Sequence, residues 1–116
     1  METKYEKING RDVKFVKYEG KWLADAYEVA IAYDLGILDA DMYLDVEHIE
    51  GYYPVTIMDG DKELECVVEL IGANGINDMK RGRRINDRVG VRNMLPPTQE
   101  ARKYVLDYIL SGNGGL

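Results

Sequence analysis

Residues 54–71, PVTIMDGDKELECVVELI, decide the fold class because a compact turn signal separates two apolar runs. The turn is Asp59-Gly60-Asp61-Lys62, and it lies between residues 54–58 and residues 63–71. The second run alternates between an apolar set and an acidic set, which are Leu64, Cys66, Val68 and Leu70 against Glu63, Glu65 and Glu69. A period of two is typical of a strand with one buried face. We therefore predict a β-hairpin here, with its glutamates on the exposed face.

A second hairpin and a helix are predicted upstream of this stretch. Residues 12–18 alternate charged and apolar side chains, and Glu19-Gly20 separates them from Trp22-Leu23. A short glycine-containing loop between such runs predicts a hairpin over residues 12–23. Apolar residues then recur at helical spacing after Asp25, which is suited to cap a first turn. We predict a helix over residues 25–35, closed by a glycine.

The remaining segments contain two shorter predicted elements and one clear helix. Residues 37–53 have weak periodicity, which predicts a short helix capped by Asp39 and then a loop. Four glycines in residues 72–92 favour one turn of helix over residues 76–80, followed by a loop. Thr98 is predicted to cap a C-terminal amphipathic helix that ends at Gly112, with an apolar stripe of Ala101, Tyr104, Val105, Tyr108 and Ile109.

These elements give an α+β fold class: two β-hairpins, a helix after the first hairpin, a short middle helix and a C-terminal amphipathic helix. The chain has 116 residues, and 46% of them are hydrophobic, which suits a single core. We predict one domain over residues 1–111. Residues 112–116 are glycine-rich and are predicted to form a flexible tail.

The distribution of charge along the chain says more about binding partners than the net charge of −6 does. Residues 80–92 carry a local charge of +5, so the rest of the chain carries −11. The basic residues of this segment are Lys80, Arg81, Arg83, Arg84, Arg88 and Arg92. Clustered guanidinium groups can hold successive phosphates, and glycines let the backbone approach them. We predict that these six side chains contact nucleic acid; the alternative is a solvated loop whose charges pair with nearby acids.

An acidic surface offers an alternative. The residues concerned are Asp39, Asp41, Asp45, Glu47 and Glu50. Such a surface could cover a basic patch on a host or phage regulatory protein, in which case the chain would be an inhibitor or adaptor. A charge pattern with two opposite sides is also compatible with a homodimer.

Catalytic and metal chemistry are not expected from this composition. The chain has one cysteine and one histidine, too few for the usual zinc site, and Cys66 lies on the predicted apolar strand face. His48 lies in an acidic stretch, where we expect a surface position. Residues 39–50 resemble a calcium loop in their acids, but Tyr43 and Leu44 occupy two positions that such a loop reserves for other residues. We predict no enzyme activity, no metal and no cofactor.

Cysteine usage and hydropathy predict the cellular setting. A single cysteine allows no intramolecular disulfide, which favours a reducing compartment. The first eleven residues are polar, and no apolar run approaches the length of a membrane span. We therefore predict a cytoplasmic protein with no membrane association.

Several short motifs occur in an order that suggests a family. They are Ile8-Asn9-Gly10, residues 13–16, Gly20-Lys21-Trp22-Leu23, Val29-Ala30, Leu35-Gly36, residues 67–71, Gly75-Ile76 and Glu100-Ala101 with Tyr104. This order resembles the BRO-type N-terminal domain of phage antirepressors. The chain departs from that pattern in lacking its Glu-Ser-Gly-Leu run and in carrying the basic loop as an insertion. The resemblance implies a phage regulatory protein that binds DNA or a repressor, without enzyme activity.

Overall fold

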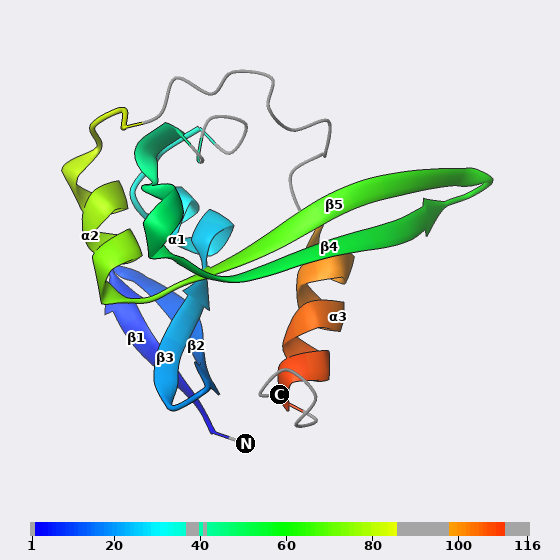
Figure 1. The fold of residues 1–116 in the computed structure, drawn as a ribbon, viewed down its shortest axis with the longest axis horizontal. Coiled ribbons are helices and arrows are strands. Elements are labelled where there is room, and N and C mark those ends of the chain that lie inside the picture. The colour runs from blue at the N-terminus through cyan, green and yellow to red at the C-terminus, as the bar shows by residue number, and fades with distance from the viewer. Residues whose placement is uncertain (1, 37–39, 41, 86–97, 111–116) are drawn as a thin grey trace.

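The computed structural model describes residues 2–36, 40, 42–85 and 98–110. Its elements are β1 (Thr3–Ile8), β2 (Arg11–Tyr18), β3 (Lys21–Asp25), α1 (Ala26–Ala32), the 3-10 turn η2 (Val46–His48), β4 (Ile49–Asp59), β5 (Lys62–Ile71), α2 (Ala73–Arg81) and α3 (Gln99–Leu110). The strands form one antiparallel sheet in the order β1-β2-β3-β5-β4 (Figure 1). This arrangement confirms the predicted α+β class.

Two tight turns create the three-stranded part of the sheet. Asn9-Gly10 joins β1 to β2 with φ values of 49° and 83°, and Glu19-Gly20 joins β2 to β3 with 49° and 79°. Positive φ at both central residues is the requirement of a type I′ hairpin turn. The predicted hairpin over residues 12–23 is confirmed as β2 and β3. Strand β1 was not predicted, although Asn-Gly is the strongest short signal for such a turn.

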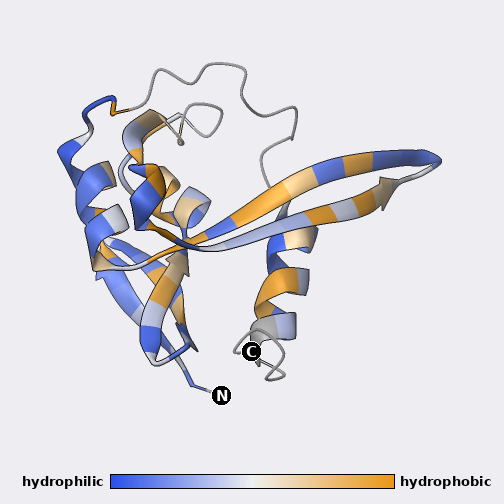
Figure 2. Ribbon diagram, viewed as in Figure 1, coloured by the Kyte–Doolittle hydropathy of each residue, from blue (hydrophilic) through white to orange (hydrophobic). Residues whose placement is uncertain are grey.

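The long hairpin of β4 and β5 confirms the prediction over residues 54–71 and extends it. Strand β4 begins at Ile49, so the prediction of a loop over residues 49–53 is wrong. Backbone pairing with the apolar end of β5 explains the difference, since Ile49 lies opposite Ile71 and Tyr53 opposite Val68. Because β5 pairs with β3 through only Leu70 and Ile71, most of the hairpin projects beyond the three-stranded part (Figure 1). Its tip is hydrophilic (Figure 2).

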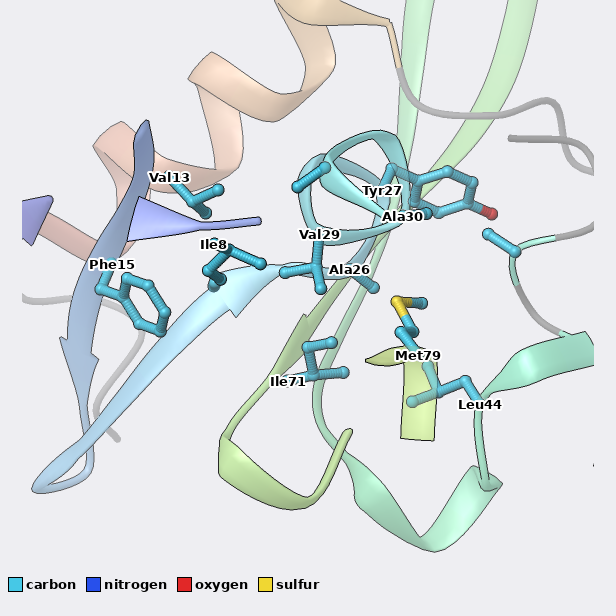
Figure 3. Close-up of a cluster of buried hydrophobic side chains, with 13 residues drawn as sticks. Ile8, Val13, Phe15, Ala26, Tyr27, Val29, Ala30, Leu44, Ile71 and Met79 are labelled. Atoms are coloured by element: carbon cyan, nitrogen blue, oxygen red, sulfur yellow. The ribbon is translucent and has the colours of Figure 1, made fainter. Parts of the chain in front are cut away.

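Helices cover both faces of the sheet. Val13 and Phe15 of β2 point to the face covered by α1, and Figure 3 shows them in a cluster with Val29 of that helix. Val16, at the alternate position, belongs to a second cluster that includes Val105 of α3. Burying each such side chain contributes roughly 1.5–3 kcal/mol. Since α1 and α3 both pack against β5, Glu69 is fully buried, and its predicted exposed position is wrong.

Helix α1 follows the predicted pattern closely. Asp25 is its N-cap residue, and its side chain accepts a hydrogen bond from the Tyr27 N–H. The helix ends at Ala32, three residues before the predicted boundary, and Asp34 then adopts a positive φ of 57°. The cap was therefore placed correctly from the sequence, and the end was placed too late.

Helix α2 is longer than the single turn predicted over residues 76–80. It covers Ala73–Arg81, and Gly82 ends it in the left-handed conformation with its N–H donating to the Met79 carbonyl. Gly75 was read as a helix breaker, but it is required for close packing. A Cβ at Gly75 would lie 2.7 Å from the Cβ of Ile71. The glycine therefore lets α2 approach the end of β5.

Helix α3 confirms the predicted C-terminal helix, with Thr98 accepting a hydrogen bond from the Ala101 N–H. Its buried side differs from the predicted stripe. Ala101 and Val105 are buried, but Tyr104 is 63% exposed and Tyr108 is 43% exposed. The reason is Arg102, which turns toward the body of the protein to reach two carboxylates. The predicted end at Gly112 and the tail 112–116 lie outside the described residues.

Within the described residues, no helix combines the length and the apolar character that crossing a bilayer requires.

Candidate nucleic-acid groove

A groove of about 700 Å³ opens between α2 and the outer part of the three-stranded sheet. Its lining combines basic, aromatic and amide side chains. The residues are Lys4, Glu6, Lys7, Ile8, Asn9, Phe15, Trp22, Tyr33, Ala73, Ile76, Asn77 and Lys80. We refer to this set as the α2 groove. Its volume lies within the range of small-ligand pockets.

Strand register builds the sheet side of the α2 groove. Lys4 lies opposite Phe15, and Lys17 lies opposite Trp22. Directly opposed residues share a face, and residues two apart along a strand also share it. The register therefore places Lys4, Phe15 and Trp22 on one face of the sheet. This is the face that packs against α1 in the core.

Helical periodicity builds the other side. Ala73, Ile76, Asn77 and Lys80 follow the spacing i, i+3, i+4 and i+7, which defines one stripe of a helix. Gly75 and Met79 belong to the buried side of α2. The helix thus turns one stripe to the core and the next stripe to the groove.

Lysine side chains lie over the aromatic rings of the groove. The Lys4 ammonium is 4.6 Å from the centroid of the Trp22 ring and 5.8 Å from that of Phe15. The Lys17 ammonium is 5.6 Å from the Trp22 centroid. At exposed sites such cation–π contacts are worth roughly 0.5–1 kcal/mol each. Since Trp22 is only partly buried, its ring is a surface that a ligand could share or take over.

The groove has a positive balance of charge. Three lysines line it, Lys4, Lys7 and Lys80, against the single carboxylate of Glu6. Lys4 forms an ion pair with Glu6 at 3.1 Å, and Lys7 pairs with Asp12 at 2.9 Å. Ion pairs as exposed as these contribute about 0–1 kcal/mol, so an anionic ligand can compete with them.

The predicted basic segment continues from one end of this groove. Lys80 lines the groove, and Arg81, Arg83 and Arg84 follow it directly with exposed side chains. Lys80 and Arg81 also lie in the last turn of α2, where cations interact favourably with the helix dipole. Arg88 and Arg92 lie outside the described residues. Of the six predicted basic residues, Lys80 therefore lines the groove, and Arg81, Arg83 and Arg84 follow it in the sequence.

The acidic set of the alternative prediction is partly engaged within the molecule. The Asp45 carboxylate accepts a hydrogen bond from the Glu47 N–H and caps η2. Glu50 forms an ion pair with Lys21 at 2.7 Å. Glu47 is exposed, whereas Asp39 and Asp41 lie outside the described residues. No specific contact favours a protein-binding role for this set.

His48 and Cys66 lie too far apart to act as a base and a nucleophile. Cys66 is opposite Val55 in the β4–β5 hairpin, whereas His48 precedes Ile49, which is opposite Ile71. Five residues of strand correspond to roughly 16 Å. The predicted burial of Cys66 is confirmed, since it is 0% exposed. Within the described residues, no group of three or more metal-ligating side chains is present. The absence of enzyme activity stays a prediction.

His48 is not the simple surface residue that was predicted. Its Nδ1 lies 2.5 Å from Oδ2 of Asp78, a nearly buried residue of α2. The same Asp78 oxygen accepts a hydrogen bond from the Asp45 N–H at 3.2 Å. The hydrogen bond with Asp78 raises the pKa of His48 above its ordinary value. This contact attaches η2 to α2 on the side away from the groove stripe.

A buried cluster of charges attaches α3 to the body. Arg102 Nη1 donates to Glu28, and its Nε lies 3.5 Å from Oδ2 of Asp25. Asp25 is 3% exposed, and burial is the main cause that raises its pKa to about 7. Arg102 acts in the opposite direction. Because α3 covers this cluster, we interpret it as a structural attachment and not as a ligand site.

Comparisons with known proteins add no assignment: no family model, no curated protein and no solved structure matches this chain. The resemblance to the BRO-type domain therefore stays a prediction. Sequence reasoning missed the groove residues outside the basic segment, above all Lys4, Lys7 and Trp22. Asn9-Gly10 was the signal that could have revealed β1 and, with it, the two lysines.

Proposed function

We propose that this protein is a small regulatory protein that binds nucleic acid through the α2 groove and the adjoining basic residues. The observation that supports the proposal is that Lys4, Lys7 and Lys80 line one groove with Trp22, with the Lys4 ammonium over its ring. Cations that accompany a partly exposed aromatic ring are a usual combination in nucleic-acid channels. The groove provides both on an otherwise acidic chain.

The arginines next to the groove supply the phosphate contacts in this proposal. Arg81, Arg83 and Arg84 are exposed, and guanidinium groups bind phosphate oxygens with two parallel hydrogen bonds. Such contacts position a nucleic acid but do not read its sequence. A phage regulatory role in the cytoplasm, as the BRO-type resemblance implies, is compatible with this activity and forms part of the proposal.

A salt titration tests the proposal on the full chain. Labelled duplex DNA, single-stranded DNA and RNA are titrated with protein at low and moderate salt, and binding is followed by fluorescence anisotropy. Each phosphate contact contributes about 0.7–0.9 to the slope of log affinity against log salt. The variant with Arg81→Ala, Arg83→Ala and Arg84→Ala should therefore lower that slope by about 2–3.

A charge-matched variant separates a local site from a general effect of net charge. Lys14→Ala, Lys62→Ala and Lys103→Ala remove the same charge from residues that do not line the groove. This control should keep the wild-type slope to within about one unit. Absence of salt-dependent binding by the wild-type protein, or equal weakening in both triple variants, would overturn the proposal.

A further inference from the structure

We infer that the ligand of the α2 groove is a single-stranded nucleic acid, one of whose unpaired bases stacks on Trp22. This inference rests on the proposed function and specifies its ligand class. It follows from the shape of the groove, from the ring contacts of Trp22 and from the exposed arginines that follow Lys80 in the chain.

The shape of the groove favours an unpaired base. The sheet surface with Phe15 forms one side and the α2 stripe with Ile76 forms the other, around a volume of about 700 Å³. A space of this size suits a base with its sugar. In a duplex, by contrast, both faces of each base are covered by its neighbours, and the ring of Trp22 lies inside the groove. A duplex could reach the basic rim but could not place a base face against this ring.

Two lysines lie over the ring of Trp22, and a base could replace the nearer one, Lys4, while Lys17 lies farther away at 5.6 Å. The Lys4 ammonium lies 4.6 Å from the ring centroid, in the region that a stacked base would occupy. An exposed cation–π contact changes affinity by about two- to fivefold, whereas stacking of one base changes it by about 5- to 150-fold. Stacking therefore outweighs the contact that it displaces. The displaced Lys4 ammonium stays close enough to bind the phosphate of the same nucleotide.

The basic segment favours a strand over a free nucleotide. A mononucleotide could satisfy Trp22 and the three groove lysines, but it would not extend to Arg83 or Arg84. Those arginines are exposed and follow Lys80 closely in the chain, so they could bind further phosphates of a continuous backbone. Asn77 supplies an exposed amide in the groove, which can donate to and accept from a base edge. These polar contacts specify no particular base.

Intrinsic fluorescence tests the inference directly because Trp22 is the single tryptophan of the chain. The wild-type protein is titrated with a thymidine oligonucleotide of about 12 nucleotides, within the usual site size. Parallel titrations use an abasic oligonucleotide with the same backbone, a duplex of equal length and thymidine monophosphate. Affinity is measured separately by anisotropy or by competition.

The inference predicts that only the thymidine oligonucleotide combines tight binding with strong quenching of Trp22. It should bind about tenfold more tightly than the abasic strand, the effect of one stacked base. Thymidine monophosphate should quench weakly and bind less tightly than the strand. Trp22→Phe should retain most of the preference for bases, whereas Trp22→Leu should abolish it. Tyr5→Ala is the matched control, because Tyr5 is exposed and does not line the groove.

The outcomes distinguish failure of the inference from failure of the proposed function. Equal binding of the thymidine and abasic strands without quenching would overturn the stacked base while leaving nucleic-acid binding intact. Stronger binding of the duplex would do the same. Equal affinity for the mononucleotide and the strand would indicate that the ligand is a free nucleotide and not a strand. No binding by any probe would overturn the proposed function itself. The probe comparison uses wild-type protein, so it is decisive even if a Trp22 variant fails to fold.

Discussion

Asp25→Asn should make the stability of this protein much less dependent on pH. The Asp25 side chain is 3% exposed, caps α1 through the Tyr27 N–H and lies beside Arg102. Asparagine retains an oxygen for the cap, so the variant keeps the helix start. It removes the ionisation of Asp25, whose pKa is raised to about 7 in the folded protein.

The sign and size of the effect follow from the two pKa values. An unfolded aspartate has a pKa of 3.8, so between pH 4 and pH 7 the folded state binds the proton more tightly than the unfolded state. The contribution of Asp25 to stability is therefore fully present below pH 4 and is lost as the pH rises through 7. The free energy of unfolding should fall by about 1.4 kcal/mol per pH unit from pH 5 to pH 7 and change little above pH 7, which gives about 3 kcal/mol between pH 5 and pH 8.

Neighbouring charges also contribute to the raised pKa of Asp25, which the variant removes. Burial is the largest cause of the raised pKa of Asp25, Arg102 opposes it, and Glu28 and Glu69 add to it. His48 also has a raised pKa, so its stabilising contact with Asp78 is present below pH 6.5 and is lost as the pH rises through its folded pKa. A smaller fall of stability with pH should therefore persist in Asp25→Asn.

Urea unfolding at pH 5, 6, 7 and 8, followed by Trp22 fluorescence, measures this difference. The wild-type curve should fall steeply with pH, and the Asp25→Asn curve should show only the smaller fall that His48 causes. Asp107→Asn is the control, because Asp107 is an exposed acid of α3 and its removal should leave the wild-type dependence unchanged. Parallel pH curves for wild type and Asp25→Asn would refute the assignment of this titration to Asp25.

Three further predictions concern the packing and contacts around α2 and β5. Gly75→Ala should destabilise the protein by about 1–3 kcal/mol in thermal or urea unfolding, because its Cβ would lie 2.7 Å from the last side chain of β5. Asp78→Asn should lower the pKa of His48, the single histidine, toward its ordinary value in an NMR titration; an unchanged value would contradict the contact. Cys66, at 0% exposure, should react with a thiol reagent only as fast as the protein unfolds; rapid labelling of the native protein would show that β5 is accessible.

Local signals predicted the elements that they specify directly. Asp25 and Thr98 were identified as helix caps because their side-chain oxygens suit unpaired N–H groups, and both accept such bonds. The alternation in residues 54–71 predicted the hairpin because it reports which side of a strand is buried. The same alternation wrongly predicted an exposed Glu69, because a period of two does not reveal that helices cover both faces of β5.

Elements that depend on distant packing were missed or shortened. Strand β1 has mostly exposed residues, so its hydropathy gives little alternation, and it forms because Asn9-Gly10 directs it against β2. Gly75 suggested a broken helix because intrinsic propensity penalises glycine. In the structure, close approach to Ile71 requires that same glycine. Tertiary contact thus reversed the meaning of the local signal.

The α2 groove was beyond sequence reasoning because three separate segments contribute its essential groups. Lys4 comes from β1, Trp22 from β3 and Lys80 from α2, and they meet only when register and helical phase are both known. The basic segment alone left both nucleic-acid contact and a solvated loop open. Trp22 and Lys80 line the same groove, and this favours nucleic acid, because a solvated loop would not require an aromatic partner.

The acidic remainder of the chain gives the proposed groove a further property. Residues outside 80–92 carry −11, so a polyanion is repelled from most of the surface and attracted only near the groove and its basic segment. Such a distribution orients the strand before contact and suppresses binding elsewhere. Removing charge at Arg81, Arg83 and Arg84 should therefore slow association more than removing the same charge elsewhere, which stopped-flow quenching of Trp22 can measure. Equal association rates in the two triple variants would show that the acidic remainder does not guide the strand to the groove.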